Sequence, residues 1–389
     1  GQSLLAHVLQ AASQMGGDVA VVVAPGSDAV KAETSRIVPR AQIFEQPAQR
    51  GTADAVLAAR PALAARSECD VIVLFADTPL IRTEVLGALR AALDAGAGIA
   101  VLGFRAQNPT GYGRLLVDDH GELTAIREEK DASEAERKID LCNSGVMAFR
   151  VPNVSELLSR IGSDNAKGEF YLTDAIAVGR DNGIRATVVA CDADDVLGIN
   201  TQEQLAEAEA VWQRRARSEL MRNGVTMIAP ETVWLSFDSQ IAAEVTVEPN
   251  VFFGTGVTVE SGARILAFSH IEGASIGRGV RVGPFARLRP GARLAADVHI
   301  GNFVEVKNVS IGEGAKANHL SYLGDGSVGA GANIGAGTIF CNYDGFNKAR
   351  TEVGDGAFIG SNSSLVAPVK IGNGAYVGSG SVITKDVAP

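Results

Sequence analysis

The hydrophobic positions in the second half of the chain recur every six residues. The repeat runs from Ile276 to Ile383, slips by one residue at Ile311 and at Val328, and is interrupted between residues 340 and 352. Neither a helical period of 3.6 residues nor a strand period of two produces this spacing. Six-residue repeats are typical of a parallel β-helix, in which each hexad forms one short strand and a turn, and stacked coils bury the aliphatic positions. The side chains predicted to face this core are Ile276, Val282, Leu288, Leu294, Ile300 and Val306, with the smaller Val280, Ala286, Ala292, Val298 and Val304 beside them.

The first 200 residues follow a different pattern, in which helical and strand-like segments alternate. The expected strands are 19–23, 41–44, 71–75 and 99–104, and the expected helices are 4–15, 28–37, 53–63 and 83–95. Two of these strands, 19–23 and 71–75, are apolar throughout and are predicted to be buried parallel strands. The alternation predicts a Rossmann-like, doubly wound α/β domain with a mostly parallel sheet.

Three regions follow from these patterns. Residues 1–200 are expected to form the α/β domain, and residues 201–224 a connecting helix that Gly224 ends as a C-cap. Residues 225–389 are expected to form the β-helix domain. Its six-residue phase first becomes visible, imperfectly, at Val247, so the coils are expected to begin near that residue.

Composition narrows the class of protein. The net charge of −10 argues against a nucleic-acid partner, because such binding needs clustered Lys and Arg. The four cysteines show no metal-ligand spacing and no disulfide framework, so reduced thiols and a cytoplasmic location are expected. Since no apolar run approaches the roughly 18 residues that a membrane span needs, no membrane partner is expected.

Several polar motifs in the first half fall where strands of an α/β sheet end. Asp77 follows a buried strand, at the edge where such sheets bind ligands, and a carboxylate there suits Mg²⁺ on a nucleotide phosphate. From position alone, Asp77 could equally cap the next helix. The glycines of Gly51-Thr52 and of the 111–114 turn let the backbone approach a ligand, although a helix cap and a plain hairpin explain them as well. The Asn143 and Asn200 side chains could simply bond the backbone.

Taken together, these motifs resemble the sugar-phosphate nucleotidyltransferases. The segments that carry the resemblance are Gln46 with Gly51-Thr52, then 75–80, 109–114, 128–132, 143–145 and 198–200, in the family's order. They look most like the uridyltransferase half of the bacterial bifunctional family that makes UDP-N-acetylglucosamine. The resemblance implies that Gln46, Gly51 and Thr52 bind uracil, that Asp77 and Asn200 hold Mg²⁺, and that Gly113, Glu128 and Asn143 hold the amino sugar.

The ends of the chain depart from that family. Its members open with a Gly-x-Gly-Thr-Arg loop after the first strand and a Lys soon afterwards, and neither is present here. Because that loop supplies donors for the triphosphate, uridyl transfer is expected to require residues that precede Gly1. Family members also continue beyond Pro389, and that tail is expected to add coenzyme contacts.

One histidine in the β-helix region has the neighbours of a reaction centre. His319 and Tyr322 occupy outward places of their hexad, where a lone histidine is usually inert. Arg289, Lys307 and Lys348 also lie at non-core places, and several cations near one histidine suggest a phosphorylated substrate. A neutral imidazole can take a proton from an attacking amine. His319, Lys307 and the Asn342 of the irregular 340–352 segment are therefore expected to gather on one face.

The second half resembles the acetyltransferase half of the same bifunctional family. The segments that carry this resemblance are 283–290, 301–307, 319–325, 333–338 and 341–345. It implies a left-handed β-helix, with His319 as general base in acetyl transfer from acetyl-CoA to glucosamine 1-phosphate. It further implies that the acceptor is held by Arg289, Lys307, Tyr322, Asn333, Asn342, Tyr343 and Lys348, and the coenzyme by Ala336, Asn342, Tyr343, Ser361 and Ser379. Family members are trimers, so a homotrimer is expected.

The resemblance therefore predicts a bifunctional enzyme of the pathway to cell-wall precursors. Acetylation of glucosamine 1-phosphate would supply N-acetylglucosamine 1-phosphate, which the first half would join to UTP with release of pyrophosphate. One alternative is a nucleotidyltransferase whose β-helix serves only structure or assembly, and it predicts no acetyl-CoA binding. Another keeps the acetyltransferase but changes the acceptor to a different amine.

Overall fold

The computed structural model describes residues 2–65 and 69–389, which form two compact units, Gln2–Glu209 and Ala210–Pro389. We call them the α/β unit and the β-helix unit. The predicted order of an α/β domain, a long helix and a stack of short parallel strands is confirmed. Within the described residues, no helix is long and apolar enough to cross a membrane.

Helices and strands of the α/β unit alternate along the chain, as predicted. The helices are α1 Leu4–Gln14, α2 Asp28–Ile37, α3 Thr52–Ala58, α4 Arg60–Ala64, α5 Thr83–Asp94, α6 Val154–Ser159 and α7 Ala175–Asp181. The strands are β1 Ala20–Val23, β2 Gln42–Glu45, β3 Val71–Val73, β4 Ile99–Arg105, β5 Arg114–Val117, β6 Leu123–Arg127, β7 Leu141–Phe149 and β8 Ala186–Ala190. The single helix expected over 53–63 is divided at Ala59, because Pro61 at the start of α4 has no N–H to donate to the preceding turn.

The sheet of the α/β unit is mixed rather than mostly parallel. Its path is β6-β5-β7-β4-β8, with β3 also paired to β7. Only β4–β8 is a parallel pair in this sheet, while β7 runs antiparallel to β3, β4 and β5. β1 pairs in parallel with β2 in a separate sheet, and only Val23 of β1 is buried. The expected full burial of β1 is wrong, because its side chains are not covered on both faces as those of β4 are.

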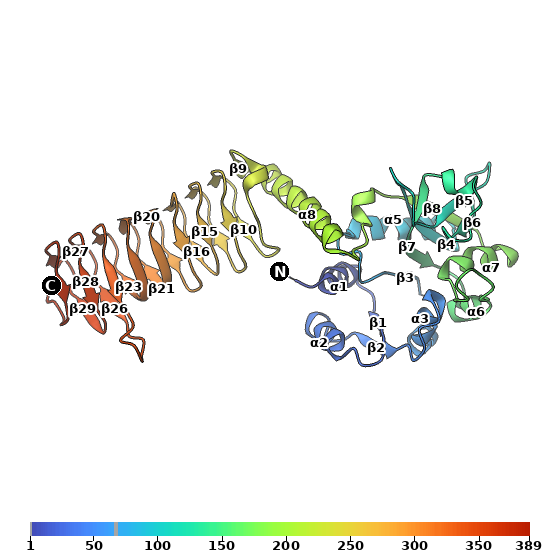
Figure 1. Ribbon diagram of the computed structural model, residues 1–389, viewed down its shortest axis with the longest axis horizontal. Coiled ribbons are helices and arrows are strands. Elements are labelled where there is room, and N and C mark those ends of the chain that lie inside the picture. Colours follow the sequence, from blue (N-terminus) through green and yellow to red (C-terminus); the bar gives the residue numbers. More distant parts are fainter. Residues whose placement is uncertain (1, 66–68) are drawn as a thin grey trace. The chain divides into compact units, whose positions relative to one another are not determined.

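The β-helix unit is a stack of coils built from short strands (Figure 1). Their parallel pairings divide the strands into three faces. Face A consists of β9 Thr226–Met227, β11 Thr246–Val247, β14 Arg264–Ile265, β17 Arg281–Val282, β20 His299–Asn302, β22 Lys316–His319, β24 Asn333–Ile334, β27 Phe358–Ile359 and β30 Tyr376–Val377. Face B consists of β12 Phe252–Phe253, β15 His270–Ile271, β18 Arg287–Leu288, the first parts of β21 Glu305–Ile311 and β23 Tyr322–Val328, and then β25 Ile339–Cys341, β28 Ser364–Val366 and β31 Val382–Ile383. Face C consists of β10 Gln240–Ile241, β13 Thr258–Val259, β16 Ser275–Ile276, β19 Arg293–Leu294, the second parts of β21 and β23, and then β26 Thr351–Val353 and β29 Val369–Ile371.

The predicted core of the coils is confirmed. Every aliphatic and small position named from the six-residue phase is at most 4% exposed. The coils begin earlier than residue 247, however, since β9 already pairs with β11, matching Thr226 to Thr246. The buried Met227 and Val233 are six residues apart, but the next buried side chain, Leu235, follows Val233 by only two residues. This shift in phase kept the first coil from being recognised in the sequence.

The long helix α8, Gln202–Arg222, ends where Gly224 adopts a φ of 93°, as expected for a C-cap. Its second half is more than a connecting arm. Trp212 and Leu220 pack against the β-helix core. The buried Gln213 donates from Nε2 to the Leu235 carbonyl (2.7 Å), and its Oε1 accepts from the Leu235 N–H (3.0 Å). This half of α8 therefore covers the apolar end of the coil stack.

Candidate active sites

The predicted uracil residues lie together in the loop between β2 and α3. Gln46 donates from Nε2 to the Gly51 carbonyl (3.1 Å) and to Asp54 Oδ2 (2.9 Å). Gly51 has a φ of 124°, and a Cβ there would lie 2.5 Å from the Phe170 carbonyl oxygen, so only glycine fits. The Thr52 hydroxyl accepts from the Leu172 N–H (2.9 Å). The segment that contains Gly51 and Thr52 is thus fixed against the distant residues Phe170 and Leu172. Asp54, which bonds Gln46, was not predicted from the sequence.

The two predicted magnesium residues are far apart in sequence, but their backbone segments lie side by side. The Ile199 N–H, next to Asn200, donates to the Asp77 carbonyl (2.9 Å). The alternative that Asp77 caps the following helix is wrong, because α5 begins after Arg82 and has no side-chain cap. This backbone bond brings the main chain of Asp77 next to the residue that precedes Asn200.

The three predicted amino-sugar residues also converge. The Asn143 N–H donates to the Gly113 carbonyl (2.8 Å). A Cβ on Gly113 would lie 3.5 Å from both Asn143 Cβ and Glu128 Oε1. Thr173 donates from its hydroxyl to Glu128 Oε1 (3.2 Å), and burial raises the pKa of the Glu128 carboxyl. Thr173 was not predicted, since nothing in its local sequence distinguishes it.

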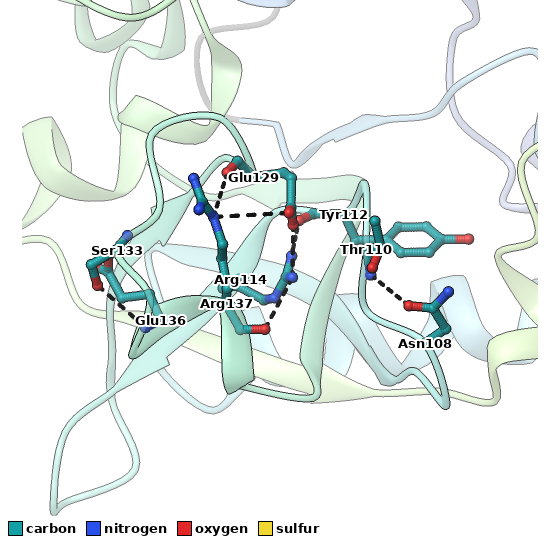
Figure 2. Close-up of polar contacts among 8 residues, drawn as sticks. All are labelled: Asn108, Thr110, Tyr112, Arg114, Glu129, Ser133, Glu136 and Arg137. Atoms are coloured by element: carbon teal, nitrogen blue, oxygen red, sulfur yellow. Dashed lines mark hydrogen bonds and ion pairs between the residues drawn. The ribbon is translucent and has the colours of Figure 1, made fainter.

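A buried arginine supports this amino-sugar cluster. Arg114, at 1% exposure, donates to the Tyr112 carbonyl, to Glu129 Oε2 (2.7 Å) and to the Arg137 carbonyl (3.2 Å). Figure 2 shows its guanidinium among these three segments. Gly113 precedes Arg114 and Glu128 precedes Glu129, so this ion pair fixes the backbone next to both predicted ligands. The sequence motif contained Arg114 and Glu129 but gave no sign of their pairing.

In the β-helix unit, one buried carboxylate organises part of the predicted acceptor set. Asp325, 7% exposed, accepts from Lys307 Nζ (3.1 Å), Asn308 Nδ2 (2.9 Å) and Asn342 Nδ2 (2.6 Å). The hydrogen bond to Asp325 is the main cause of the raised pKa of Lys307. Lys348 lies beside Lys307. Sequence analysis missed Asp325 and Asn308, although Asp325 belongs to the motif that begins at His319.

A second carboxylate holds the remaining predicted cation. Arg289 donates from Nη1 to Glu305 Oε1 (2.8 Å). Glu305 lies directly opposite Tyr322 in the β21–β23 register, so Arg289, Glu305 and Tyr322 occupy adjacent coils of face B. Tyr343 is 60% exposed in the irregular segment, where a β-bridge pairs it with Lys348.

His319 lies on a different face from these cations. It ends β22 on face A, and its Nδ1 is 2.7 Å from Asn302 Oδ1 on β20. The chain then turns a corner at Leu320, with a φ of 51°, before Tyr322 begins β23 on face B. The expectation that His319, Lys307 and Asn342 share one face is therefore wrong, because this corner places them on two adjoining faces.

Three of the five predicted coenzyme residues, Ala336, Ser361 and Ser379, stack in a column with His319, whereas Asn342 and Tyr343 lie in the irregular segment. The His319 carbonyl accepts from Gly337, which follows Ala336. The Ala336 carbonyl accepts from Asn362, which follows Ser361, and the Ser361 carbonyl accepts from Gly380, which follows Ser379. Ala336, Ser361 and Ser379 thus occupy, in the following coils, the position that His319 occupies in its own coil. Asn333 lies on face A, in the same coil as Ala336. The column leads from His319 toward the last coils.

Comparisons with known proteins match both units. Residues 1–139 match the MobA-like NTP transferase domain, and residues 350–385 match the bacterial transferase hexapeptide (six repeats) family. Relatives named bifunctional protein GlmU from Azorhizobium caulinodans, Xanthobacter autotrophicus and Agrobacterium fabrum are 58%, 57% and 55% identical to the chain. Each alignment covers 100% of this chain, and 86%, 86% and 85% of the respective relative. The chain, with its nucleotidyltransferase unit and its hexapeptide β-helix, therefore belongs to the bifunctional GlmU family.

Proposed function

We propose that the clusters described above are the reaction centres for two successive transfers. The chain is a bifunctional transferase of UDP-N-acetylglucosamine synthesis. It transfers acetyl from acetyl-CoA to glucosamine 1-phosphate, and then uridylate from UTP to N-acetylglucosamine 1-phosphate with release of pyrophosphate. The observation that carries the acetyl-transfer site is the corner of the β-helix, where the column of His319, Ala336, Ser361 and Ser379 borders the cations of face B.

In acetyl transfer, His319 acts as the general base. The amine nitrogen of the acceptor forms a bond to the thioester carbonyl carbon, and the bond from that carbon to sulfur breaks. His319 takes the proton that the amine loses and returns it to the departing thiolate. Backbone N–H groups and the second N–H of the Asn342 amide, whose first N–H donates to Asp325, are the available donors for the oxyanion. The coenzyme lies along Ala336, Ser361 and Ser379. Their position supports this placement, because they continue the column that begins at His319.

The acceptor phosphate is held by Arg289, Lys307 and Lys348, with Tyr322 and Asn333 beside it. Arg289 and Lys307 are each anchored by a carboxylate, which fixes their positions before substrate binds. Fixed cations bind a phosphate at less entropic cost than mobile ones do. This supports a phosphorylated acceptor over an unphosphorylated amine.

In uridyl transfer, the phosphate oxygen of N-acetylglucosamine 1-phosphate attacks the α-phosphorus of UTP, and pyrophosphate leaves. Gln46, Gly51 and Thr52 hold the uracil, and Gly113, Glu128 and Asn143 hold the amino sugar. No covalent intermediate is needed, because phosphoryl-type transfer depends on positioning and on neutralising charge.

Magnesium would be held by Asp77 and Asn200. Their oxygens are the donor type that Mg²⁺ prefers. Mg²⁺ commonly takes one or two protein oxygens and completes its shell with substrate phosphates and water. When bound, Mg²⁺ would neutralise phosphate charge. In the full-length protein, Asp77→Ala is expected to abolish uridyl transfer while sparing acetyl transfer, and Mg²⁺-dependent uridyl transfer in that variant would contradict the assignment.

A homotrimer is the proposed assembly. Phe268, Phe285 and Phe303 stack along one corner of the coils, with ring centroids 4.9 and 5.2 Å apart, and each is about half exposed. An exposed aromatic row of this kind suits packing against another β-helix. Sedimentation of the Phe285→Asp variant tests this, since a trimer held through this corner would dissociate.

We also propose a cytoplasmic location. The four cysteines are free, which agrees with a reducing compartment.

The decisive experiment measures thiol release from acetyl-CoA with glucosamine 1-phosphate and, separately, glucosamine as acceptor. Release that depends on the 1-phosphate is expected. His319→Ala should lower the rate about 10²-fold or more, as removal of a general base does. Wild-type rates in that variant, or equal rates with both acceptors, would overturn the proposed site.

A further inference from the structure

We propose that Asn302 is a positioning residue for acetyl transfer, which holds the His319 imidazole in the tautomer and orientation that a base requires. This inference rests on the proposed role of His319. Asn302 belongs to the 301–307 segment that carries the family resemblance, but no role was predicted for it. Asn302 lies on β20 and His319 on β22, and the register of the two strands pairs them directly.

The geometry determines where the ring proton sits. His319 Nδ1 lies 2.7 Å from Asn302 Oδ1. An amide oxygen can only accept a hydrogen bond, so Nδ1 must carry the proton. The other ring nitrogen, Nε2, then keeps its lone pair and is the atom able to take a proton from an amine.

The backbone keeps this contact at a constant length. The Leu320 N–H, immediately after His319, donates to the Asn302 carbonyl (3.1 Å). This main-chain bond, one residue after His319, and the register of β20 and β22 hold the two residues beside each other in adjacent coils. A side chain on a neighbouring coil is thus a stiffer support for the ring than a loop residue would be.

The surrounding charged groups cannot replace Asn302. His299 on β20, Lys316 on β22 and Arg281 on β17 lie on the same face, and Tyr322 follows the corner. Lysine and arginine only donate hydrogen bonds, so they cannot accept from Nδ1. Arg281, Lys316 and His319 lower the pKa of His299, after burial as the main cause, so this face already disfavours an added positive charge.

A neutral acceptor also suits a base better than a carboxylate here. An aspartate at 302 would orient the ring equally well, but its negative charge would stabilise the imidazolium and keep the proton on the ring. Asparagine supplies orientation without that charge. The choice of amide over carboxylate is therefore expected to appear in the pH dependence of acetyl transfer.

The test compares Asn302→Ala and Asn302→Asp with the wild-type chain in thiol release from acetyl-CoA. Asn302→Ala should lower kcat about 10- to 100-fold, the usual loss for an orienting partner, with little change in KM for either substrate. Asn302→Asp should recover much of kcat at high pH, while the acid limb of its profile moves to higher pH. Asn373→Ala is the matched control, because Asn373 Oδ1 likewise bridges coils by accepting from the Asp355 N–H (2.9 Å).

The His319→Ala background separates the possible outcomes. There Asn302→Ala should cause no further loss, because its effect passes through the imidazole. Wild-type kcat in Asn302→Ala, or an equal loss in both backgrounds, would overturn the positioning role. Wild-type activity in His319→Ala alone would instead contradict the proposed base. Thermal melting and acetyl-CoA binding of each variant check that the coils remain folded.

Discussion

The two units assemble their candidate sites in opposite ways. In the β-helix, residues that meet across coils are close in sequence: His319 and Asn302, or Lys307 and Asp325, are separated by 17 and 18 residues. In the α/β unit, Thr52 contacts Leu172 across 120 residues. One site is thus a product of a local repeat, and the other is a product of long-range folding.

This difference predicts different responses to damage. Each coil of a solenoid contacts only its neighbours, so a defect stays near its origin. In the α/β unit, each hydrophobic cluster contains side chains from segments that are distant in sequence. A defect in one cluster is therefore expected to destabilise the whole unit. The following variants test that contrast, from the largest expected effect to the smallest.

A matched pair of core truncations tests it most directly. Phe253 in the β-helix and Phe149 in the α/β unit are both 0% exposed. Replacing either by alanine should cost about 3–5 kcal/mol through lost burial and a cavity. In Phe253→Ala, hydrogen exchange should quicken only in the coils next to β12. In Phe149→Ala, it should quicken throughout the α/β unit.

The control for this pair is the unit that was not altered. Its exchange rates should match those of the wild type in each variant. Accelerated exchange spread over all the coils of Phe253→Ala would show that the β-helix behaves as one cooperative body, and the proposed contrast would be lost.

Breaking the ion pair between Arg114 and Glu129 should lower stability less than the core truncations do, and only in the α/β unit. Glu129→Ala leaves the Arg114 guanidinium buried without its charge partner, at 1% exposure. The expected loss of unfolding free energy is about 3 kcal/mol, the lower part of the usual range, because the Glu129 side chain is 28% exposed. Chemical denaturation followed by α/β-unit probes measures it.

The same variant also tests what the pair is for. Since it fixes the backbone beside Gly113 and Glu128, the full-length variant should show a higher KM for N-acetylglucosamine 1-phosphate, while its KM for UTP changes little. Acetyl transfer should be unaffected. Equal changes in both KM values would mean that Arg114 and Glu129 support the unit in general rather than the sugar cluster.

The smallest expected effect is a pH-dependent gain in stability when Glu128 is replaced by glutamine. Burial raises the pKa of this carboxyl above its usual value of 4.5. As pH rises past 4.5, the unfolded chain releases the proton before the folded unit does, so the free energy of unfolding falls through that window. Glu128→Gln removes this loss and should raise the melting temperature of the α/β unit at pH 7.

The advantage of Glu128→Gln should vanish below about pH 4.5, where the carboxyl is protonated in both states. Melting curves at pH 4 and pH 7 measure the difference. The gain should come with weaker sugar binding, since the carboxylate is a proposed ligand. A variant stabilised equally at both pH values would mean that the ionisation of Glu128 does not oppose folding.

The candidate sites were only partly predictable. Sequence motifs named Lys307 and Asn342, but not the Asp325 that holds both. They named Arg114 only as part of a turn, not as a buried ion-pair partner of Glu129. A motif shows which side chains are available, whereas hydrogen-bond partners depend on which segments fold against them.

The β-helix was determined largely by the sequence alone. Its six-residue phase specifies which side chains face inward, because each coil has nearly the same geometry as the next. Only the tertiary structure decided that His319 and Lys307 lie on adjoining faces, since a corner at Leu320 redirects the chain between them. It also decided that the α/β sheet is mixed, because strand direction depends on which distant strands pair, and periodicity along the chain carries no information about pairing.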